Sequence, residues 1–592
     1  MSKEVLITVC TGTGGIASGG EDVLAAFREA LSSAGITASC RERCRVQRVG
    51  CKGFCSQDVL VDVAVNGAIT TYRKVRPDMV ARIVSEHIVA GMPVAEWVVD
   101  GSYHAFHEKQ KKVVLSHCGV IDPEEIQSYR AVGGYGAAER AVLSMTPEEI
   151  IAVIKRSRLR GRGGGGFPTG LKWELCARHT ADTKYVVCNG NESDPGAFMD
   201  TSLMEGDPHS VIEGMIICAK AVGSHRGYIY TKAEYALAVK RLNRAIEHCY
   251  AAGFLGKGIF GSDFDFDVEV FPAPGAFVCG EATALLRSLE GKRGMPSAKI
   301  WRTAEKGLWN KPTVLNNVET FANIPKIIEK GSQWFSRLGT ERSGGTKVFS
   351  LSGKVRNTGL IEVPIGTTLR EIIFDIGGGI EGGKACKGVH IGGPTGGCIP
   401  AARFDMEVDY ESLAQAGSMM GSGGMVVLDE TSCIVDTTRF FVGVIQGESC
   451  GKCAPCRIGT KRMLEILERI AGGRAKEGDL ELLEELAHSI RETSLCGLGM
   501  TAPNPVLSTL RYFRDEYEEH IRRKRCRAAV CKALLTYSVV ESACTGCGAC
   551  KRVCPADAIR GTRKKPHRID ANLCVRCGTC LDACKFNAIM KV

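Results

Sequence analysis

The stretch "RGRGGGGFPTG", residues 160–170, places four consecutive glycines in a chain whose composition is otherwise that of an ordinary globular protein. Because glycine has no Cβ atom, the backbone amides there can approach a phosphate or an aromatic ring directly. A helix that begins after the loop would add its dipole to an anion site. A flexible turn is the plain alternative, since a glycine-rich loop alone is a weak signal. The companion motifs along the chain therefore decide its meaning.

Length and composition indicate several domains. The chain has 592 residues, 44% hydrophobic and 24% charged, enough to bury a core in each domain. No apolar run approaches the roughly eighteen residues of a membrane span, and "MSKEVLITVC" lacks the features of a signal peptide. We expect a cytoplasmic protein. In that reducing compartment, 28 cysteines indicate thiolate ligation of metals or clusters rather than disulfides.

Two cysteine runs near the C-terminus repeat one spacing. "CTGCGACKRVCP" and "CVRCGTCLDAC" each place four cysteines at intervals of three, three and four. In two-cluster ferredoxins the first three thiolates of a run bind one cluster and the fourth reaches the other. Zinc knuckles, the alternative, would leave the third cysteine of each run unexplained. The predicted [4Fe-4S] ligands are Cys544, Cys547, Cys550 and Cys584 for one cluster, and Cys574, Cys577, Cys580 and Cys554 for the second.

A further three-plus-one set of cysteines lies upstream. "GESCGKCAPCRIGT" contains Cys450, Cys453 and Cys456, and "TSLCGLGMTAP" contains Cys496. The segments between them carry apolar residues at helical spacing. This pattern predicts a third [4Fe-4S] cluster on a small helical bundle, with zinc as the competitor when the pattern is taken alone.

Five ordered motifs carry a family resemblance. The chain resembles the FMN-binding, NADH-oxidising flavoprotein subunit of respiratory complex I and its soluble relatives. Its layout is similar to the beta subunits of electron-bifurcating [FeFe]-hydrogenases, bifurcating transhydrogenases and NAD-dependent formate dehydrogenases. The motifs are "GRGGGGFPTGLKW" (161–173), "CNGNESDPGAF" (188–198), "APGAFVCGEATALLRSLEG" (273–291), "GLWNKPTVLNNVET" (307–320) and "ESCGKCAPCRIGT" (448–460).

The resemblance implies a multidomain α/β protein. Strand-like runs with Gly and Pro turns in residues 347–373 agree with a β-grasp insert. The expected parts are a thioredoxin-like ferredoxin-type domain (1–95), a linker (96–130), a Rossmann-like FMN and NAD(P)-binding domain (131–340), a β-grasp, SLBB-like domain (341–430), a helical bundle with [4Fe-4S] (431–525) and a two-cluster ferredoxin domain (526–592).

The resemblance also assigns residues to FMN, and no catalytic residue beyond the flavin. Glycines would line the flavin, Lys172 would pair with its phosphate or ring oxygens, and residues after the strands would reach the ring, the ribityl chain and the phosphate. The implied cofactor-binding residues are Gly163, Gly164, Gly166, Phe167, Lys172, Asn189, Asn191, Glu192, Ser193, Phe277, Gly280, Glu281, Ala282, Asn316, Asn317 and Thr320.

The nicotinamide side of this site departs from the family. Asn191 replaces an aspartate, Ala282 replaces a glutamate, Leu175 replaces an aromatic residue, and "KIWRT" (299–303) replaces a proline-rich stretch. Phe167 remains as one wall for adenine. A carboxylate in such pockets accepts the ribose hydroxyls and repels a 2′-phosphate. Its loss at Ala282, with Arg302 nearby in sequence, leaves NAD(H), NADP(H) and loss of nicotinamide binding all open.

The N-terminal domain departs as well. Relatives bind a [2Fe-2S] cluster through four cysteines, of which Cys10, Cys51 and Cys55 are present here, whereas Gly15 occupies the fourth position. Cys40 and Cys44 are candidate substitutes outside the family's ligand positions. A [2Fe-2S] cluster and a vestigial domain both remain open.

A zinc site is predicted between the bundle and the ferredoxin tail. "HIRRKRCRAAVCKAL" offers His520, Cys526 and Cys531 as three ligands, and similar hinge sites occur in the bifurcating relatives. Cys433 is the candidate for the fourth. The alternative is a basic helix end with inert thiols.

These predictions combine into an electron-transfer function. NAD(P)H would give hydride to FMN, and electrons would pass singly to the bundle cluster and then to the terminal clusters. The expected partners are a small thioredoxin-like [2Fe-2S] subunit, ferredoxin and a catalytic subunit such as a hydrogenase, formate dehydrogenase or transhydrogenase, with electron bifurcation. A non-enzymatic relay with a degenerate nicotinamide site is the alternative. The net charge of +10 suits an acidic partner or solvated faces, and no motif reads nucleic acid.

Overall fold

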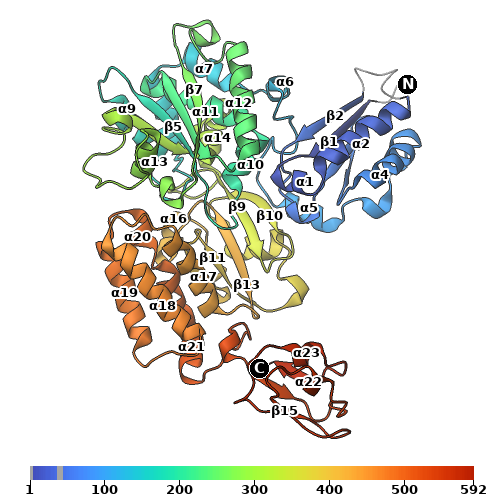
Figure 1. Cartoon of the computed structure of the whole chain (residues 1–592). Coiled ribbons are helices and arrows are strands. Elements are labelled where there is room, and N and C mark those ends of the chain that lie inside the picture. The colour runs from blue at the N-terminus through green and yellow to red at the C-terminus, as the bar shows by residue number, and fades with distance from the viewer. Residues whose placement is uncertain (1–3, 36–43, 592) are drawn as a thin grey trace. The chain divides into compact units, whose positions relative to one another are not determined.

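The computed structural model describes residues 4–35 and 44–591 (Figure 1). The chain divides into two compact units, and each is considered by itself. The first runs to Gly383 and adds residues 389–396 and 401–427; the second contains 384–388, 397–400 and the chain from Leu428 onward. Within the described ranges, no helix is both long and apolar enough to cross a bilayer.

The N-terminal domain is a four-stranded sheet with helices. Its strand order is β2-β1-β3-β4, with β2 parallel to β1 and the other two pairs antiparallel. Helix α2 buries Val23, Leu24, Phe27 and Leu31, the apolar face expected from its helical spacing. The elements are β1 (Val5–Cys10), α1 (Thr13–Ala17), α2 (Gly20–Ser33), β2 (Cys44–Val49), β3 (Val61–Val65), β4 (Ala68–Tyr72), α4 (Pro77–Arg82) and α5 (Gly101–Glu108).

The central domain contains a fully parallel sheet of order β7-β6-β5-β8. Helix α11 is apolar on every side and all its residues except Lys220 are buried, because it packs within the core, with many contacts to α14. The elements are α6 (Ile126–Ala131), α7 (Gly136–Ser144), α8 (Pro147–Arg156), α9 (Thr169–Ala177), β5 (Tyr185–Gly190), α10 (Met199–Gly206), α11 (Pro208–Val222), β6 (Arg226–Lys232), α12 (Ala236–Ala251), β7 (Asp267–Ala273), α13 (Ala282–Leu289), β8 (Thr313–Asn317), α14 (Val318–Lys330) and α15 (Ser332–Ser336).

A second sheet follows, of order β10-β9-β13-β11-β12. Its first two strands form an antiparallel pair, and β13 runs parallel to β9. The burial of β9 and β10 is nearly continuous, as in strands covered on both faces. The elements are β9 (Thr346–Gly353), β10 (Gly359–Pro364), β11 (Cys386–Ile391), β12 (Gly397–Pro400), α16 (Tyr410–Gln415) and β13 (Gly424–Asp429).

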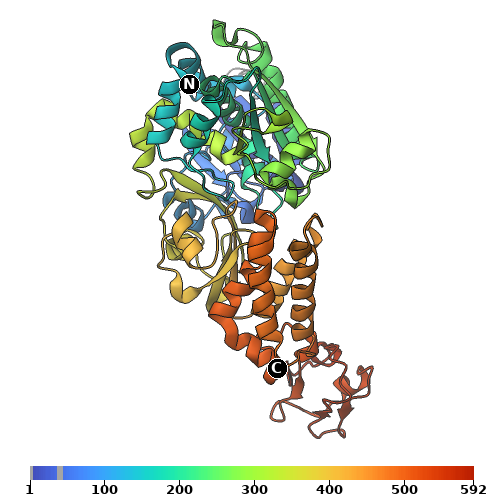
Figure 2. The ribbon, with the colours of Figure 1, turned by 90° about the vertical axis from the view of Figure 1, so that its left-hand side faces the viewer.

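A helical bundle and a small cysteine-rich tail complete the chain. The bundle helices run side by side in Figures 1 and 2, and α17 packs against both α18 and α21. The bundle comprises α17 (Ile434–Gly447), α18 (Thr460–Ala471), α19 (Asp479–Thr493), α20 (Gly497–Thr501) and α21 (Asn504–Arg522). The tail comprises β14 (Tyr537–Val539), α22 (Ala549–Arg552), β15 (Ile559–Arg560), β16 (Arg568–Ile569), α23 (Thr579–Asp582) and β17 (Ile589–Lys591). The predicted multidomain α/β fold class is confirmed.

The tail reproduces the sequence repeat in space. Each half has a short helix, α22 or α23, that follows a glycine with positive φ, Gly548 at 74° and Gly578 at 84°. Strand β14 pairs with β17, and β15 with β16. The fully buried apolar centre of the tail is small, formed by Cys550, Ile559, Cys580 and Ile589. Domains of this size need metals or disulfides to supplement so small a core.

A buried ion pair joins the central parallel sheet to the second sheet. Lys347 Nζ of β9 lies 2.5 Å from Glu319 Oε2 of α14, and the two side chains are 0% and 2% exposed. Lys347 also donates to the carbonyls of Val348 (2.7 Å) and Ser422 (2.6 Å), while Glu319 Oε1 accepts from the Val348 amide (2.9 Å). Both desolvated charges are therefore well compensated by neighbours.

We predict that Glu319→Gln destabilises the protein strongly, because it leaves the Lys347 ammonium buried without an anion. Breaking such a pair costs about 3–5 kcal/mol of the free energy of unfolding. The matched control is Glu329→Gln, on the same helix, whose partner Lys326 lies 3.1 Å away in a half-exposed pair. That change should cost at most about 1 kcal/mol. Urea denaturation followed by tryptophan fluorescence measures both, and equal midpoints for the two variants would contradict the assignment.

Candidate functional site

The order of the parallel sheet locates a crevice. The chain proceeds from β5 to β6 and β7 on one side, then returns to add β8 on the other side of β5. Ligands of parallel α/β sheets bind beyond the carboxyl ends of the strands where the order reverses in this way. Asn189 at the end of β5 pairs in register with Asn317 at the end of β8. The structure thus brings these two predicted FMN residues to one edge, with Asn191 and Asn316 beside them in the chain.

The glycine-rich loop reaches the same edge. A Cβ atom at Gly163 would lie 3.0 Å from the Cβ of Asn317, and the Arg162 amide donates to Thr320 Oγ1 (2.9 Å). At Gly164 (φ +118°), a Cβ would meet the backbone of Gly421 at 3.2 Å.

The protein itself requires glycine at two positions of this loop. At Gly166 (φ +60°), a Cβ would lie 2.5 Å from the Tyr410 ring, and Gly164 has the positive φ just described. Gly165, in contrast, meets no described protein atom within 4 Å. The expectation that the glycines serve only the flavin is therefore incomplete, and Gly165 is the position with open space in front of it.

Side chains after β5 bind the loop after β7. Asn189 Nδ2 donates to the Gly280 carbonyl (3.1 Å), Asn191 Nδ2 to the Ala276 carbonyl (3.1 Å), and Ser193 Oγ to the Gly275 carbonyl (3.2 Å). These three bonds bring residues 189–193 and 275–280 together, and the second segment includes Phe277.

Two carboxylates of the predicted site cap helices. Glu192 accepts from the amides of Met199 (2.9 Å), Asp200 (3.2 Å) and Thr201 (3.0 Å), at the start of α10. Burial raises the pKa of Glu192, and these bonds oppose that rise. Glu281 Oε2 accepts from the amides of Thr283 (2.9 Å) and Ala284 (3.0 Å) at the start of α13. Both residues therefore shape the backbone around the crevice.

Unsatisfied polar atoms remain in the crevice. Asn316 is 3% exposed, and neither its Oδ1 nor its Nδ2 has a hydrogen-bond partner in the described part of the chain; the same holds for Asn191 Oδ1. Lys172 Nζ donates to the Leu315 carbonyl (2.7 Å), and burial lowers its pKa to about 8. Buried polar groups in native proteins normally have partners, so their absence here fits a polar ligand such as FMN.

A cavity of about 450 Å³ shares Lys172 with this crevice. It brings together residues at which the sequence departs from the flavoprotein pattern, namely Leu175, Ala282 and the segment from Lys299 onward. Lys299 is paired with Glu281 Oε1 (3.1 Å), and Lys306 Nζ lies 4.1 Å from the Trp301 ring centre. The lining residues are Phe167, Lys172, Leu175, Ala282, Thr283, Lys299, Ile300, Trp301, Arg302, Thr303 and Ala304.

The cysteines of the tail gather in two interleaved sets. One small cavity is lined by Cys544, Cys547, Cys550 and Cys584, and a second by Cys554, Cys574, Cys577 and Cys580. The fourth cysteine of each run thus lies with the first three of the other. The Ala558 amide donates to Cys554 Sγ (3.2 Å) and the Ala588 amide to Cys584 Sγ (3.3 Å), so the two halves match in detail.

The bundle cysteines also lie close together. Burial, and the nearby thiols of Cys453, Cys496 and Cys450, raise the pKa of the Cys456 thiol, while a hydrogen bond with Ser449 Oγ (3.2 Å) opposes this rise. Four thiolates in one place repel one another unless a cation binds them. The arrangement fits a metal cluster.

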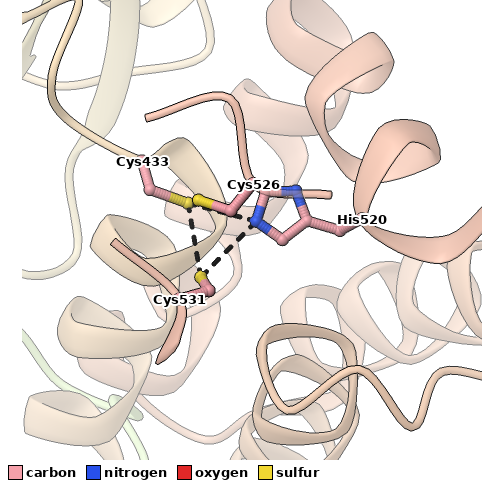
Figure 3. A group of neighbouring side chains, drawn as sticks. All are labelled: Cys433, His520, Cys526 and Cys531. Atoms are coloured by element: carbon pink, nitrogen blue, oxygen red, sulfur yellow. Dashed lines mark hydrogen bonds between the residues drawn. The ribbon is translucent and has the colours of Figure 1, made fainter. Parts of the chain in front are cut away.

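A compact group of four side chains lies at the base of α17 and α21 (Figure 3). Cys433 Sγ is 3.4 Å from His520 Nε2 and 3.7 Å from Cys531 Sγ, and Cys531 Sγ is 3.4 Å from His520 Nε2. With Cys526, all four ligand atoms lie within 4.8 Å of one another, and all four residues are buried. His520 Nδ1 bonds the Glu516 carbonyl (2.7 Å), which directs Nε2 toward the thiols. Cys433, the candidate fourth zinc ligand, joins the predicted three.

The N-terminal domain brings Cys10, Cys51 and Cys55 together. Cys51 Sγ lies 3.5 Å from Cys55 Sγ, while Cys10, Cys51 and Asp58 form a group with ligand atoms within 4.8 Å of one another. Sequence reasoning missed Asp58, although it follows Cys55 by three residues. Burial raises the pKa of Asp58 to about 6.

Two proposed substitutes for the missing cysteine fare differently. Cys44 is wrong as a ligand candidate, because it pairs with Val5 at one end of β1 while Cys10 is at the other end, opposite Val49. Cys40 lies outside the described residues. At Gly15 itself, a Cβ atom would lie 2.4 Å from the Cys10 carbonyl oxygen, so no side chain fits there.

Four segments match known domain families. They are the Nuo51 FMN-binding domain (residues 154–326), the SLBB domain (348–398), the NADH-ubiquinone oxidoreductase-F iron-sulfur binding region (436–520) and the 4Fe-4S dicluster domain (543–589). Fold and site together thus define an FMN- and iron–sulfur-containing electron-transfer subunit of an oxidoreductase.

Whole-chain relatives specify the family. NADP-reducing hydrogenase subunit HndC of Solidesulfovibrio fructosivorans is 55% identical over 484 residues, 82% of this chain and 98% of that protein. The NADH-quinone oxidoreductase F-type protein (F 2) of Rhizobium meliloti (strain 1021) is 43% identical over 414 residues, 70% of this chain and 98% of that protein. A crystal structure of an NAD+-reducing [NiFe]-hydrogenase in the H2-reduced state matches with a TM-score of 0.62 at 28% identity, covering 88% of this chain and 84% of that one. The chain belongs to the family of HndC and the F-type subunits of NADH-quinone oxidoreductases.

We predict that Gly165→Ala weakens FMN binding without affecting folding. The protein leaves open space at Gly165, so an added methyl group there would collide only with a bound ligand. Overpacking of about 1.4 kcal/mol corresponds to about tenfold weaker binding. Gly164→Ala is the comparison, since its positive φ and the Gly421 backbone should lower thermal stability as well. Flavin retention after gel filtration and the melting temperature separate the two, and full FMN occupancy in Gly165→Ala would contradict the ligand contact.

Proposed function

We propose that this chain is the nicotinamide-dependent flavin subunit of a multi-subunit oxidoreductase. It exchanges electrons between NAD(P)(H) and FMN, and passes them singly through iron–sulfur clusters to ferredoxin or a partner catalytic subunit in electron bifurcation. The single observation that carries this proposal is the continuity of the 450 Å³ cavity with the FMN crevice through Lys172. A nucleotide in the cavity would meet a flavin in the crevice at that side chain.

The chain's own residues fit FMN in defined ways. When bound, FMN supplies the conversion of a two-electron hydride transfer into one-electron steps. Asn316 offers an unpaired donor and an unpaired acceptor, and Gly165 offers open space at the backbone. Lys172 holds a cationic group close to neutrality at physiological pH, which suits a site where negative charge develops.

The cavity supports binding of NADP(H) as well as NAD(H). Arg302 and Lys299 contribute cationic groups to its lining, while Ala282 contributes no carboxylate that would repel a 2′-phosphate. Phe167 is 39% exposed and Trp301 is 55% exposed, so two aromatic faces are available to an adenine ring. The relation to HndC, whose name describes an NADP-reducing hydrogenase, supports the same specificity.

The cysteine groups support three [4Fe-4S] clusters, one [2Fe-2S] cluster and a structural zinc ion. The bundle cluster at Cys450, Cys453, Cys456 and Cys496 is the proposed exit from FMN, and the two terminal clusters are the proposed route onward. The group at Cys433 fits zinc, because two thiolates on a tetrahedral zinc ion lie about 3.8 Å apart for bonds of about 2.3 Å.

The tail offers a basic surface for an acidic electron-transfer partner. Lys564 donates its amide to the Gly546 carbonyl (3.0 Å), so the exposed run at residues 563–565 lies against the loop that holds Cys544 and Cys547. Positive charge beside a cluster steers acidic proteins such as ferredoxin toward it. The remaining proposed partners are a small thioredoxin-like [2Fe-2S] subunit and a hydrogenase, formate dehydrogenase or transhydrogenase subunit, in the cytoplasm.

We predict that Ala282→Glu shifts the preference toward NADH. A carboxylate there would accept hydrogen bonds from the ribose hydroxyls of NADH but would repel the phosphate of NADPH. Charged hydrogen bonds of about 1.5–3 kcal/mol correspond to a change of about ten- to a hundredfold. Stopped-flow reduction of FMN by each nucleotide, at matched salt, measures the ratio.

Ala282→Gln is the matched control, because it has the same size without the charge. An unchanged NADPH-to-NADH ratio in Ala282→Glu would show that residue 282 does not face the ribose. If neither nucleotide reduces the wild-type flavin, the nicotinamide function is refuted and the chain acts as a relay.

A further inference from the structure

We propose that Asp58 is the fourth protein ligand of the N-terminal cluster. With Cys10, Cys51 and Cys55 it would form a three-thiolate, one-carboxylate [2Fe-2S] site, a proposal that rests on the presence of that cluster in the proposed function. The position where relatives have a fourth cysteine is Gly15, which has no room for a side chain. The missing ligand must therefore come from elsewhere in the chain.

The Asp58 carboxylate lies beside the loop that lacks its cysteine. Its Oδ2 is 3.3 Å from the point where a Cβ atom of Gly14 would lie, directly before Gly15 in the chain. The same side chain belongs to the close group with Cys10 and Cys51. Asp58 thus extends from the second cysteine loop to the first, and it occupies the neighbourhood of the lost thiol.

One oxygen of this carboxylate has no partner in the protein. Asp58 Oδ1 is buried and makes no hydrogen bond to any of residues 4–35 and 44–591. A buried carboxylate oxygen without a partner is costly, because it has lost its hydration without replacement. A bound iron ion would satisfy it. The Gly53 amide donates to Cys51 Sγ (3.3 Å), an interaction that stabilises a thiolate ligand.

The shape of the ligand set favours two metal ions over one. Cys51 and Cys55 are 3.5 Å apart, close to the spacing of about 3.8 Å for two thiolates on one tetrahedral metal. Cys55, however, is not part of the compact group formed by Cys10, Cys51 and Asp58. At the Cys433 site, by contrast, all four ligand atoms lie within 4.8 Å of one another, as one tetrahedral ion requires.

This elongated arrangement gives each iron a pair of ligands. Cys51 and Cys55 would bind one iron, and Cys10 with Asp58 would bind the other. A carboxylate is a harder donor than a thiolate, so the two irons would be electronically unequal. The visible absorption and the EPR spectrum of the reduced cluster should therefore differ from those of an all-cysteine site.

The test compares four full-length proteins. They are the wild type, Asp58→Cys, Asp58→Ala and the control Asp62→Asn, whose carboxylate pairs with Lys52 and Thr71 three to four residues further along the chain. EPR of the dithionite-reduced proteins is recorded at a temperature where [4Fe-4S] signals are broadened. Iron, zinc and FMN are measured on the same samples, and full FMN content serves as the check on folding.

We expect a [2Fe-2S] signal in the wild type and in Asp62→Asn. Asp58→Cys should keep the intensity of the signal with shifted g values and altered visible bands. Asp58→Ala should lose the signal and about two irons per chain. A merely structural role of Asp58 would not shift the g values of a retained cluster.

Two results overturn the ligand assignment alone: identical spectra for Asp58→Cys and the wild type, or a full signal in Asp58→Ala. If Asp58→Cys does not fold, Asp58→Ala decides between these outcomes. A wild type without the signal refutes the N-terminal cluster itself, and the ligand assignment with it. A second zinc ion in place of that signal would instead identify a mononuclear site.

Discussion

The ion pair between Lys347 and Glu319 is the constraint on which the flavin site depends. Glu319 lies in the first turn of α14, directly after β8, so its position also sets that of Asn316 and Asn317. Lys347 belongs to β9 and also binds the Ser422 carbonyl, next to Gly421, which packs on the glycine-rich loop. Because two desolvated charges are stable only when fully compensated, the pair permits little movement between these elements. One buried contact thus fixes the floor and the cover of the crevice.

Metal binding takes over the role of a hydrophobic core in the cysteine-rich tail. Its buried apolar centre is very small, and eight cysteines surround two cavities. Assembly of thiolates without a cation is unfavourable, so cluster binding supplies free energy of folding there. The group at Cys433 presents the same chemistry at smaller scale: residues of α21 and the following loop are joined to the start of α17. Electron transfer and structural stability therefore draw on the same ligands.

Local spacing made the tail predictable, whereas contacts between distant segments did not. The interleaved ligand sets follow from two short cysteine runs, because each loop is confined to its own few residues. Asp58 escaped prediction because its proximity to Cys10 depends on the packing of two loops. The helix-capping role of Glu192 and the positive φ values at Gly164 and Gly166 also have no signature in the sequence alone. Cys44 was excluded only by the register of β1 and β2.

The central claim is that electrons leave the flavin through the bundle cluster. Cys453→Ser removes one ligand of that cluster and leaves the crevice and the cavity intact. In anaerobic stopped-flow experiments with the nucleotide that reduces the wild type, flavin bleaching should keep its wild-type rate. Reduction of the terminal clusters, followed by freeze-quench EPR, should be lost. Terminal clusters that are reduced by NAD(P)H as fast as in the wild type would contradict this route.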